Sequence, residues 1–340
     1  MTISQDRKGV IDALRGYFII WIGLYNTFAV FNAIRPNLVL SSILLFINDK
    51  GWFCLSAIFG YGFGVLIKRS DGSNFTFQKR MFMLFGIGMF NNLFFYGDIL
   101  KEYAIIGLIL FYTKNISSKF SIFYCLTIFI FTLFALYIVP FDMHRAGDLK
   151  GYFADNNPLL ANLKYCYTIN TQSLYFGICY HLEMLFLAFI GYFMAFYQLE
   201  SVIVLHRKKL FYGAFFTMLL CLFLIFFEVQ KNNPLIKLLF FFYILSLSVC
   251  FVLGFYRITK KYKSFSLLLA NFGRRSLTIY LMQNFLICTI WLWGETPDFR
   301  IYCLGQLLIL LLSKWSTKNG VGIVEYYWKH WSWTTNKIEI

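Results

Sequence analysis

The strongest candidate for a chemically active residue in this chain is a histidine inside an apolar stretch. His181 is the one histidine so placed, and the other three lie in more polar segments, at His144, His206 and His330. A neutral imidazole surrounded by hydrocarbon could take a proton from an acceptor hydroxyl or amine, which predicts a general base. The structural alternative is a buried histidine that hydrogen-bonds to a neighbouring helix, and the sequence leaves both open.

A carboxylate lies close to this histidine in the chain. Glu183 follows His181 by two residues, so on a helix its side chain points to nearly the opposite face, about 200° round the axis. The two side chains are therefore not expected to pair. Glu183 could carry a proton, pair with a buried cation or stay protonated in lipid.

Three more polar residues complete the candidate catalytic set. Asn26 and Asn91 could donate hydrogen bonds to a developing oxyanion. Asp98 follows Gly97 at a tight reversal, where an aspartate commonly caps or forms the turn, and the alternative is that it binds an acceptor or orients the base. Polar groups in hydrocarbon are costly, so we expect these side chains to face one another in one polar cavity that opens outward.

Four charged residues form a second candidate set, for binding an acyl donor. Asp12 and Arg15 lie three residues apart on one helix face and are expected to form an ion pair, unless Arg15 binds a donor phosphate instead. Arg274 and Arg275 open a later apolar stretch. There they either anchor the topology or bind the donor, since the N-terminus of a helix favours anions.

The charges between the apolar stretches indicate how these residues are positioned. When the gaps are taken alternately, 22 of the 31 Lys and Arg residues fall in one set and nine in the other. This alternation is the positive-inside pattern of a multi-pass membrane protein. It predicts a protein of the cytoplasmic (inner) membrane with both termini in the cytoplasm, whose basic inner face meets anionic lipid headgroups.

Composition supports the same class. The chain of 340 residues is 59% hydrophobic and only 14% charged, which a soluble domain could not bury. A helix needs about 20 residues to cross ~30 Å of hydrocarbon. We expect one all-α, membrane-embedded domain over residues 1–340 with ten spans, at 13–33, 51–67, 81–97, 99–113, 120–139, 173–197, 210–228, 236–256, 276–294 and 301–315.

The remaining segments have their own expected places. The apolar stretch 36–48 is too short to cross and is expected to be interfacial or re-entrant. An outer loop at about 140–172 could cover the cavity, and the basic inner segment 257–275 is expected to lie along the headgroups. Gly60 and Gly64 lie one helical turn apart and would let a neighbouring helix approach closely.

Two function classes are excluded by the pattern of charge and cysteine. The net charge of +15 belongs to one face of the membrane and not to a soluble module, so nucleic-acid binding is excluded. No Cys/His spacing predicts a metal site, and no bound cofactor is expected.

Five motifs, in order along almost the whole chain, resemble those of the bacterial domain-of-unknown-function family 418. They are KGVIDALRG at 8–16 with Asn26, the Phe-Gly-rich stretch 53–64, GDIL at 97–100 with Tyr103, Ala104 and Gly107, GRRSLTIYL at 273–281 with Gln283, and GIVEY at 322–326 with Trp328 and Lys329. One departure stands out: the family often has a histidine before the Gly-Asp step, where this chain has Asn91.

That family has acyltransferase-3 and heparan-glucosaminide acetyltransferase-like membrane proteins as wider relatives. The resemblance implies acyl transfer from a cytosolic thioester, with acyl-CoA as co-substrate, to a small molecule or envelope glycan at the outer side of a bacterial inner membrane. The donor would then approach Arg15, Arg274 and Arg275, and the acceptor would approach Asp98 and the loop 140–172, with His181 as base. Two alternatives stay open: a proton-coupled small-molecule transporter or exporter that uses His181 and Glu183, and a non-catalytic membrane partner protein.

Overall fold

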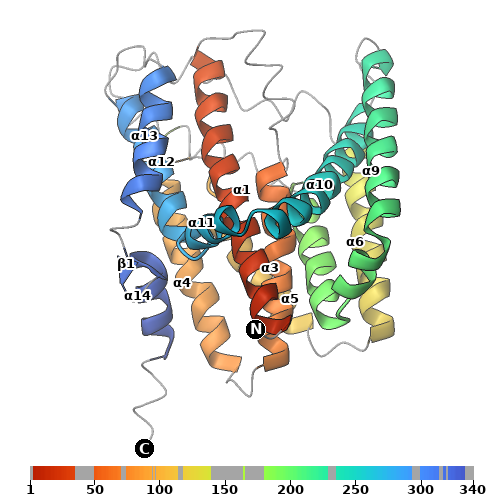
Figure 1. Cartoon of the computed structure of the whole chain (residues 1–340), viewed down its shortest axis with the longest axis horizontal. Coiled ribbons are helices and arrows are strands. Elements are labelled where there is room, and N and C mark those ends of the chain that lie inside the picture. Colours follow the sequence, from red (N-terminus) through yellow and green to blue (C-terminus); the bar gives the residue numbers. More distant parts are fainter. Residues whose placement is uncertain are drawn as a thin grey trace, which may run out of the picture.

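The structure is a computed structural model that describes most of the chain. The described residues are 3–34, 50–69, 74–93, 95, 97–113, 118–138, 164, 180–228, 235–292, 299–313, 317–318 and 321–333. They form an all-α assembly with one short two-stranded hairpin (Figure 1). The expected interfacial stretch 36–48 lies outside the described residues, as does the outer loop 140–172 apart from Lys164.

The helices follow the apolar stretches of the sequence. They are α1 (Ile3–Ile34), α3 (Lys50–Arg69), α4 (Asn74–Asn92), α5 (Leu100–Thr113), α6 (Ser118–Ile138), a helix over Tyr180–Phe196, α9 (Glu200–Glu228), α10 (Leu235–Lys261), α11 (Lys263–Gly273), α12 (Ser276–Leu292), α13 (Phe299–Leu312) and α14 (Ile323–Trp333). Strands β1 (Thr317–Lys318) and β2 (Val321–Gly322) pair antiparallel. Each of the ten predicted spans overlaps one helix, and the basic segment 257–275 contains α11.

Two of the described helices are long and apolar enough to cross a membrane, over Val202–Phe226 and Leu235–Lys261. The other apolar helices are shorter, at Gly51–Ile67, Ile122–Ile138, Tyr180–Phe196, Ser276–Thr289 and Cys303–Leu312. Helix α5 has 14 residues and is therefore about 21 Å long, well short of the ~30 Å hydrocarbon layer.

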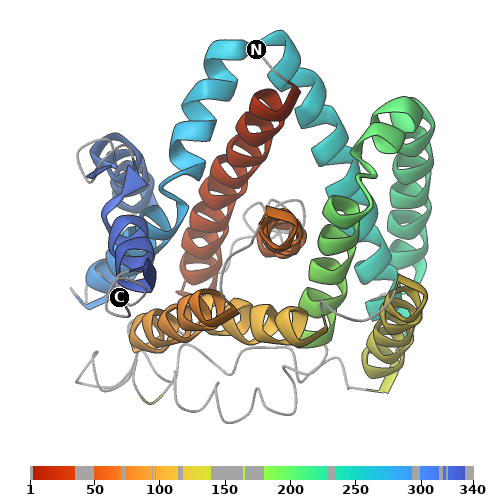
Figure 2. The same cartoon turned by 90° about the horizontal axis from the view of Figure 1, so that it is seen from below.

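Helix α3 is the centre of the assembly. Figure 2 shows it end-on, inside a ring formed by α1, α4, α5, the Tyr180–Phe196 helix and α10. A helix that is apolar on every side lies in a protein core or in lipid. Accordingly the first turns of α3 are buried, with Trp52, Phe53 and Ser56 among the least exposed residues.

The small-residue face of α3 packs directly on the Tyr180–Phe196 helix, as the sequence predicts. A Cβ atom added to Gly60 would lie 1.9 Å from the carbonyl oxygen of Ala188. In return, a Cβ atom added to Gly191 would lie 1.8 Å from the carbonyl oxygen of Ala57. Because these obstacles are backbone atoms, the two helices can approach this closely only while both positions are glycine.

The basic segment is held in a similar way. Helix α11 crosses α1, and a Cβ atom on Gly273 would lie 1.7 Å from the carbonyl oxygen of Asp12. Leu269, Ala270 and Phe272 of α11 are buried at this crossing or near it. The crossing fixes the position of the end of α11 along α1, and therefore also the position of the start of α12.

Helices α6 and α9 form the edge of the assembly and turn large apolar side chains outward. The most exposed of them are Phe123, Ile130 and Phe134 on α6 and Leu205, Phe216 and Phe226 on α9. Contiguous apolar surface of this extent is rare on proteins that are surrounded by water. The edge therefore calls for an apolar environment or an apolar partner.

The helix contact at Gly60 gives the first prediction. Gly60→Ala should lower stability by about 1–3 kcal/mol, because the added methyl group meets backbone that cannot move aside without separating the helices. The measurement is the midpoint of thermal unfolding of the protein purified in detergent. Gly213→Ala on α9 is the matched control, since a Cβ atom there meets nothing within 4 Å, and equal midpoints for the two variants would contradict the packing.

Candidate functional site

Asp98 closes the turn between α4 and α5. Its Oδ2 atom accepts hydrogen bonds from the backbone N–H groups of Leu100 (3.1 Å) and Lys101 (3.2 Å), which begin α5. Its Oδ1 atom accepts a hydrogen bond of 2.6 Å from the side-chain amide of Asn91. Of the roles expected for Asp98, the structure shows the capping one.

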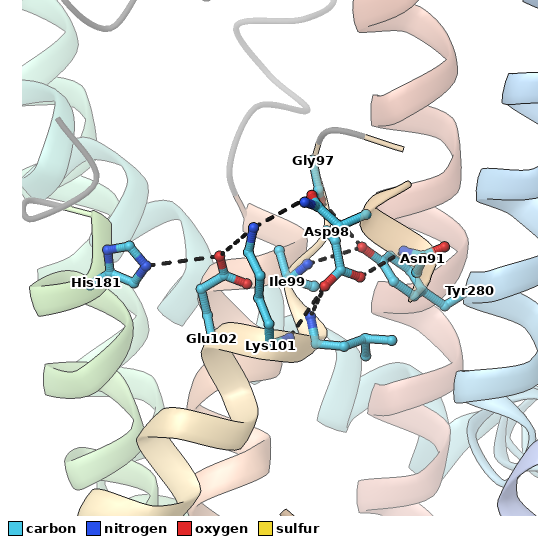
Figure 3. A network of polar contacts seen from close by, with 10 residues as sticks. Asn91, Gly97, Asp98, Ile99, Lys101, Glu102, His181 and Tyr280 are labelled. Carbon is cyan, nitrogen blue, oxygen red and sulfur yellow. Dashed lines mark hydrogen bonds and ion pairs between the residues drawn. The ribbon is translucent and has the colours of Figure 1, made fainter. Parts of the chain in front are cut away.

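Tyr280 connects this turn to α12. Its hydroxyl group accepts a hydrogen bond from the N–H of Ile99 (3.2 Å) and donates one to the carbonyl oxygen of Gly97 (3.3 Å), as Figure 3 shows. Tyr280 is almost fully buried, so both hydrogen bonds are shielded from water. The late LT-x-Y motif thus contacts the Gly-Asp motif, because the side chain of Tyr280 hydrogen-bonds to the backbone of the turn.

Tyr280 brings the Asp98 turn close to the start of α12. It follows Arg275 by five residues, about 7 Å along α12. The turn between α4 and α5 therefore lies beside the first turns of α12.

A carboxylate holds the start of α12. The Oε1 atom of Glu325 in α14 accepts hydrogen bonds from the N–H groups of Leu277 (2.7 Å) and Thr278 (3.1 Å), which have no partner within their own helix. The Thr278 hydroxyl donates to Oε2 of Glu325 and accepts from the N–H of Val324 (3.2 Å). Because Glu325 is buried, its negative charge acts on the positive end of the α12 dipole without competition from water.

His181 faces a carboxylate that sequence reasoning missed. The Oε1 atom of Glu102 lies 3.8 Å from Nε2 of His181 and 3.7 Å from Nζ of Lys101. Glu102 is only 6% exposed, and its Oε2 atom has no hydrogen-bond partner among the described residues. Figure 3 shows the resulting chain of contacts from His181 through Glu102 and Lys101 to the Asp98 turn. The available signal was a Lys-Glu pair at the start of an apolar stretch.

The electrostatics of the turn depend on burial. Burial raises the pKa of the Asp98 carboxyl group to about 7. The hydrogen bond from Asn91 lowers the pKa of Asp98, and the nearby charge of Glu102 raises it. Two buried carboxyl groups therefore share this region with the single ammonium group of Lys101 between them (Figure 3).

Asn26 belongs to a second, separate cluster of amides. Its side chain donates a long hydrogen bond of 3.5 Å to Oδ1 of Asn284, and Gln306 donates one of 3.1 Å to the hydroxyl of Thr27. Asn284 lies one turn after Tyr280 on α12, so the amide cluster adjoins the Asp98 turn. The structure thus divides the expected set between two clusters, with Asn26 in one and Asn91, Asp98 and His181 in the other. Glu183 is half-buried on the Tyr180–Phe196 helix, two residues after His181.

The expected donor-binding residues have partners within the protein. Asp12 and Arg15 form the predicted ion pair, at 3.4 Å. Arg275 donates a hydrogen bond of 3.0 Å to the carbonyl oxygen of Ser313 at the end of α13. Arg274 hydrogen-bonds to Asn271 one turn before it and is exposed. Of the three arginines, Arg274 is therefore the one most open to a ligand.

Within the part of the chain that the structure describes, no three His, Cys, Asp or Glu side chains gather to hold a metal ion.

Comparison with known proteins gives relatives in Bacillus. Over 176 residues, 44% of this chain and 42% of the relative, the sequence is 27% identical to "Uncharacterized protein YxaH" of Bacillus subtilis (strain 168). Over 161 residues, 44% of this chain and 46% of the relative, it is 29% identical to "Uncharacterized 39.9 kDa protein in amylase 3'region" of Bacillus acidopullulyticus. The chain thus matches less than half the length of either relative. No protein-family profile and no solved structure matches the chain.

The contact of Tyr280 with the turn gives the second prediction. Tyr280→Phe should lower stability by about 1–3 kcal/mol, because it leaves the buried N–H of Ile99 and C=O of Gly97 without this partner. The check is thermal unfolding in detergent, with Tyr212→Phe as control because Tyr212 is 68% exposed. A Tyr280→Phe protein that melts with the wild type would show that the turn does not depend on the hydroxyl group.

The Glu325 cap gives the third prediction. Glu325→Gln and Thr278→Val should each destabilise the protein, and the double variant should lose less than the sum of the two, because both remove the same interaction. Each single loss should be about 1–3 kcal/mol. The check is a double-mutant cycle on thermal or denaturant unfolding, in which strictly additive losses would count against the contact.

Proposed function

We propose that the protein is a multi-pass membrane acyltransferase whose general base is His181, oriented by Glu102. The observation that carries this proposal is the buried carboxylate 3.8 Å from the imidazole. A histidine that faces a carboxylate is the recurring arrangement of a base that must take a proton and hold the resulting charge. The ion-pair distance is longer than a hydrogen bond, as catalytic contacts often are before substrate binds.

The chemistry follows from the two ring nitrogens. A proton on Nε2, which faces Glu102, leaves Nδ1 as the nitrogen with the lone pair. The acceptor's hydroxyl or amine gives its proton to Nδ1 as its oxygen or nitrogen bonds to the acyl carbon of the thioester. The C–S bond then breaks, and the leaving thiolate takes the proton from His181. Glu102 stabilises the imidazolium between these steps.

The donor side of the proposal rests on the place of Arg274. An acyl-CoA carries phosphates at one end and the thioester at the other, and Arg274 is an exposed cation close to the start of α12. The Asp98 turn contacts the same part of α12. The proposed donor site therefore lies close to the turn that adjoins the catalytic pair. Arg15 and Arg275 serve mainly to hold Asp12 and the end of α13.

The membrane setting is part of the proposal. Ten helices overlap the ten predicted spans, and two of them, over Val202–Phe226 and Leu235–Lys261, are long and apolar enough to cross a membrane. The outward apolar faces of α6 and α9 call for lipid. The charge bias favours a cytoplasmic location of both termini. We therefore place the protein in the bacterial inner membrane as a single membrane-embedded domain, with an acceptor that is a small molecule or an envelope glycan.

One observation favours a second candidate, a proton-coupled transporter. Glu102 is buried with one oxygen unpartnered among the described residues, and intramembrane carboxylates of this kind often carry protons. Under this alternative His181 and Glu102, and not His181 and Glu183, form the proton path.

The test uses purified protein and labelled acyl-CoA with an extract of envelope acceptors. His181→Ala should lower transfer at least about a hundredfold, because a positioned base contributes that much or more. Glu102→Gln should lower transfer less and shift its pH profile, because it leaves the imidazole without its counter-charge. His206→Ala on α9 is the control, since His206 is exposed and hydrogen-bonds to Val202 of its own helix.

Two outcomes would count against acyl transfer. Transfer that survives in His181→Ala would remove His181 as the base. Uptake into proteoliposomes driven by a pH gradient, lost in Glu102→Gln and independent of any acyl donor, would replace the enzyme with the transporter.

A further inference from the structure

The junction of α10 and α11 is an elbow that carries only positive charge. Tyr262 separates the two helices with a non-helical backbone (φ −118°, ψ 83°), and Figures 1 and 2 show α10 and α11 meeting there at an angle. Exposed cations surround the break; they are Arg257, Lys260, Lys261 and Lys263. The chain has no Asp or Glu between Glu228 and Glu295, so this stretch supplies no internal counter-charge.

The same elbow exposes apolar side chains. Phe265, Leu267 and Leu268 of α11 are 43%, 63% and 42% exposed, while Leu269, Ala270 and Phe272 are buried. The contact of Gly273 with the backbone of Asp12 fixes which face of α11 is turned inward. The outward apolar side chains are therefore not covered by the described residues.

We propose that this basic elbow (Arg257, Lys260, Lys261, Lys263 with Phe265, Leu267 and Leu268) binds an anionic phospholipid. The cations would take the phosphate of the headgroup, and the three apolar side chains would lie along an acyl chain. Clusters of Lys and Arg beside an apolar helix are the usual recognition surface for anionic lipid. A soluble phosphate would satisfy the cations but would leave the apolar side chains uncovered, which is why the lipid is the favoured occupant.

Binding at the elbow would act on the rest of the protein through α11. The far end of α11 leads directly into Arg274, Arg275 and the start of α12, where Glu325 and Tyr280 make their contacts. A lipid that holds the elbow would thus hold α12 against the Asp98 turn. This inference does not depend on the reaction that the protein catalyses.

The test compares two triple variants that remove the same charge. Lys260→Gln/Lys261→Gln/Lys263→Gln changes the elbow, and Arg207→Gln/Lys208→Gln/Lys209→Gln changes three exposed cations of α9. Binding of phosphatidylglycerol and of phosphatidylcholine to each purified protein is measured by native mass spectrometry, and thermal unfolding is followed in nanodiscs of each lipid. Wild-type protein should prefer phosphatidylglycerol, and the elbow variant should lose that preference on the order of tenfold or more.

The α9 variant should keep both the lipid preference and the stabilisation by phosphatidylglycerol. Equal losses in the two variants would show a general charge effect and overturn the site, as would an elbow variant that binds like the wild type. Inorganic phosphate or CoA that displaces the lipid completely would also overturn it. If the triple variant does not fold, Lys260→Gln and Lys263→Gln are measured singly, and each should show a partial loss.

Discussion

The buried carboxylate of Glu325 at the start of α12 is the interaction on which the arrangement of the protein most depends. A helix that begins inside a protein leaves N–H groups that must find an acceptor, and α12 begins in such a place. Glu325 supplies that acceptor from α14, far away in the sequence, with Thr278 as a second contact. One charged side chain thereby connects the C-terminal helix to the helix that carries Tyr280 and the amides Gln283 and Asn284.

The candidate catalytic pair is positioned from two sides by packing that does not involve it. On one side, Tyr280 hydrogen-bonds to the Asp98 turn, and Asp98 caps the first turn of α5. These contacts fix the position of Glu102, which lies in that first turn. On the other side, Gly60 and Gly191 lock the Tyr180–Phe196 helix against α3, which sets the place of His181. Because glycine contacts and backbone hydrogen bonds allow little adjustment, the distance between carboxylate and imidazole is determined by the scaffold. This is the organisation expected of a site that must be preorganised.

Sequence reasoning was most successful where a signal is local. The helices overlap the predicted spans, Asp12 and Arg15 pair one turn apart, and Gly60 marks a close helix contact. It failed where position depends on a partner distant in the chain. No local pattern indicates that the Asp98 turn meets Tyr280 of α12. Glu102 was missed because one carboxylate near a span end has no periodic pattern, and its importance appears only when His181, 79 residues later in the numbering, lies beside it.

The contacts also change what the motifs mean. Residues of the Gly-Asp, LT-x-Y and closing GIVEY motifs touch one another through Tyr280, Thr278 and Glu325. Each of these contacts caps a helix or satisfies a buried backbone group, which any sequence with this fold would require whatever its reaction. The motifs therefore indicate how this chain folds, and they say little about its chemistry. The proposed chemistry rests instead on Glu102 and His181, which are not among the quoted motif residues. A relative that keeps the Glu325 and Tyr280 contacts but lacks this pair would be expected to have the fold without the base.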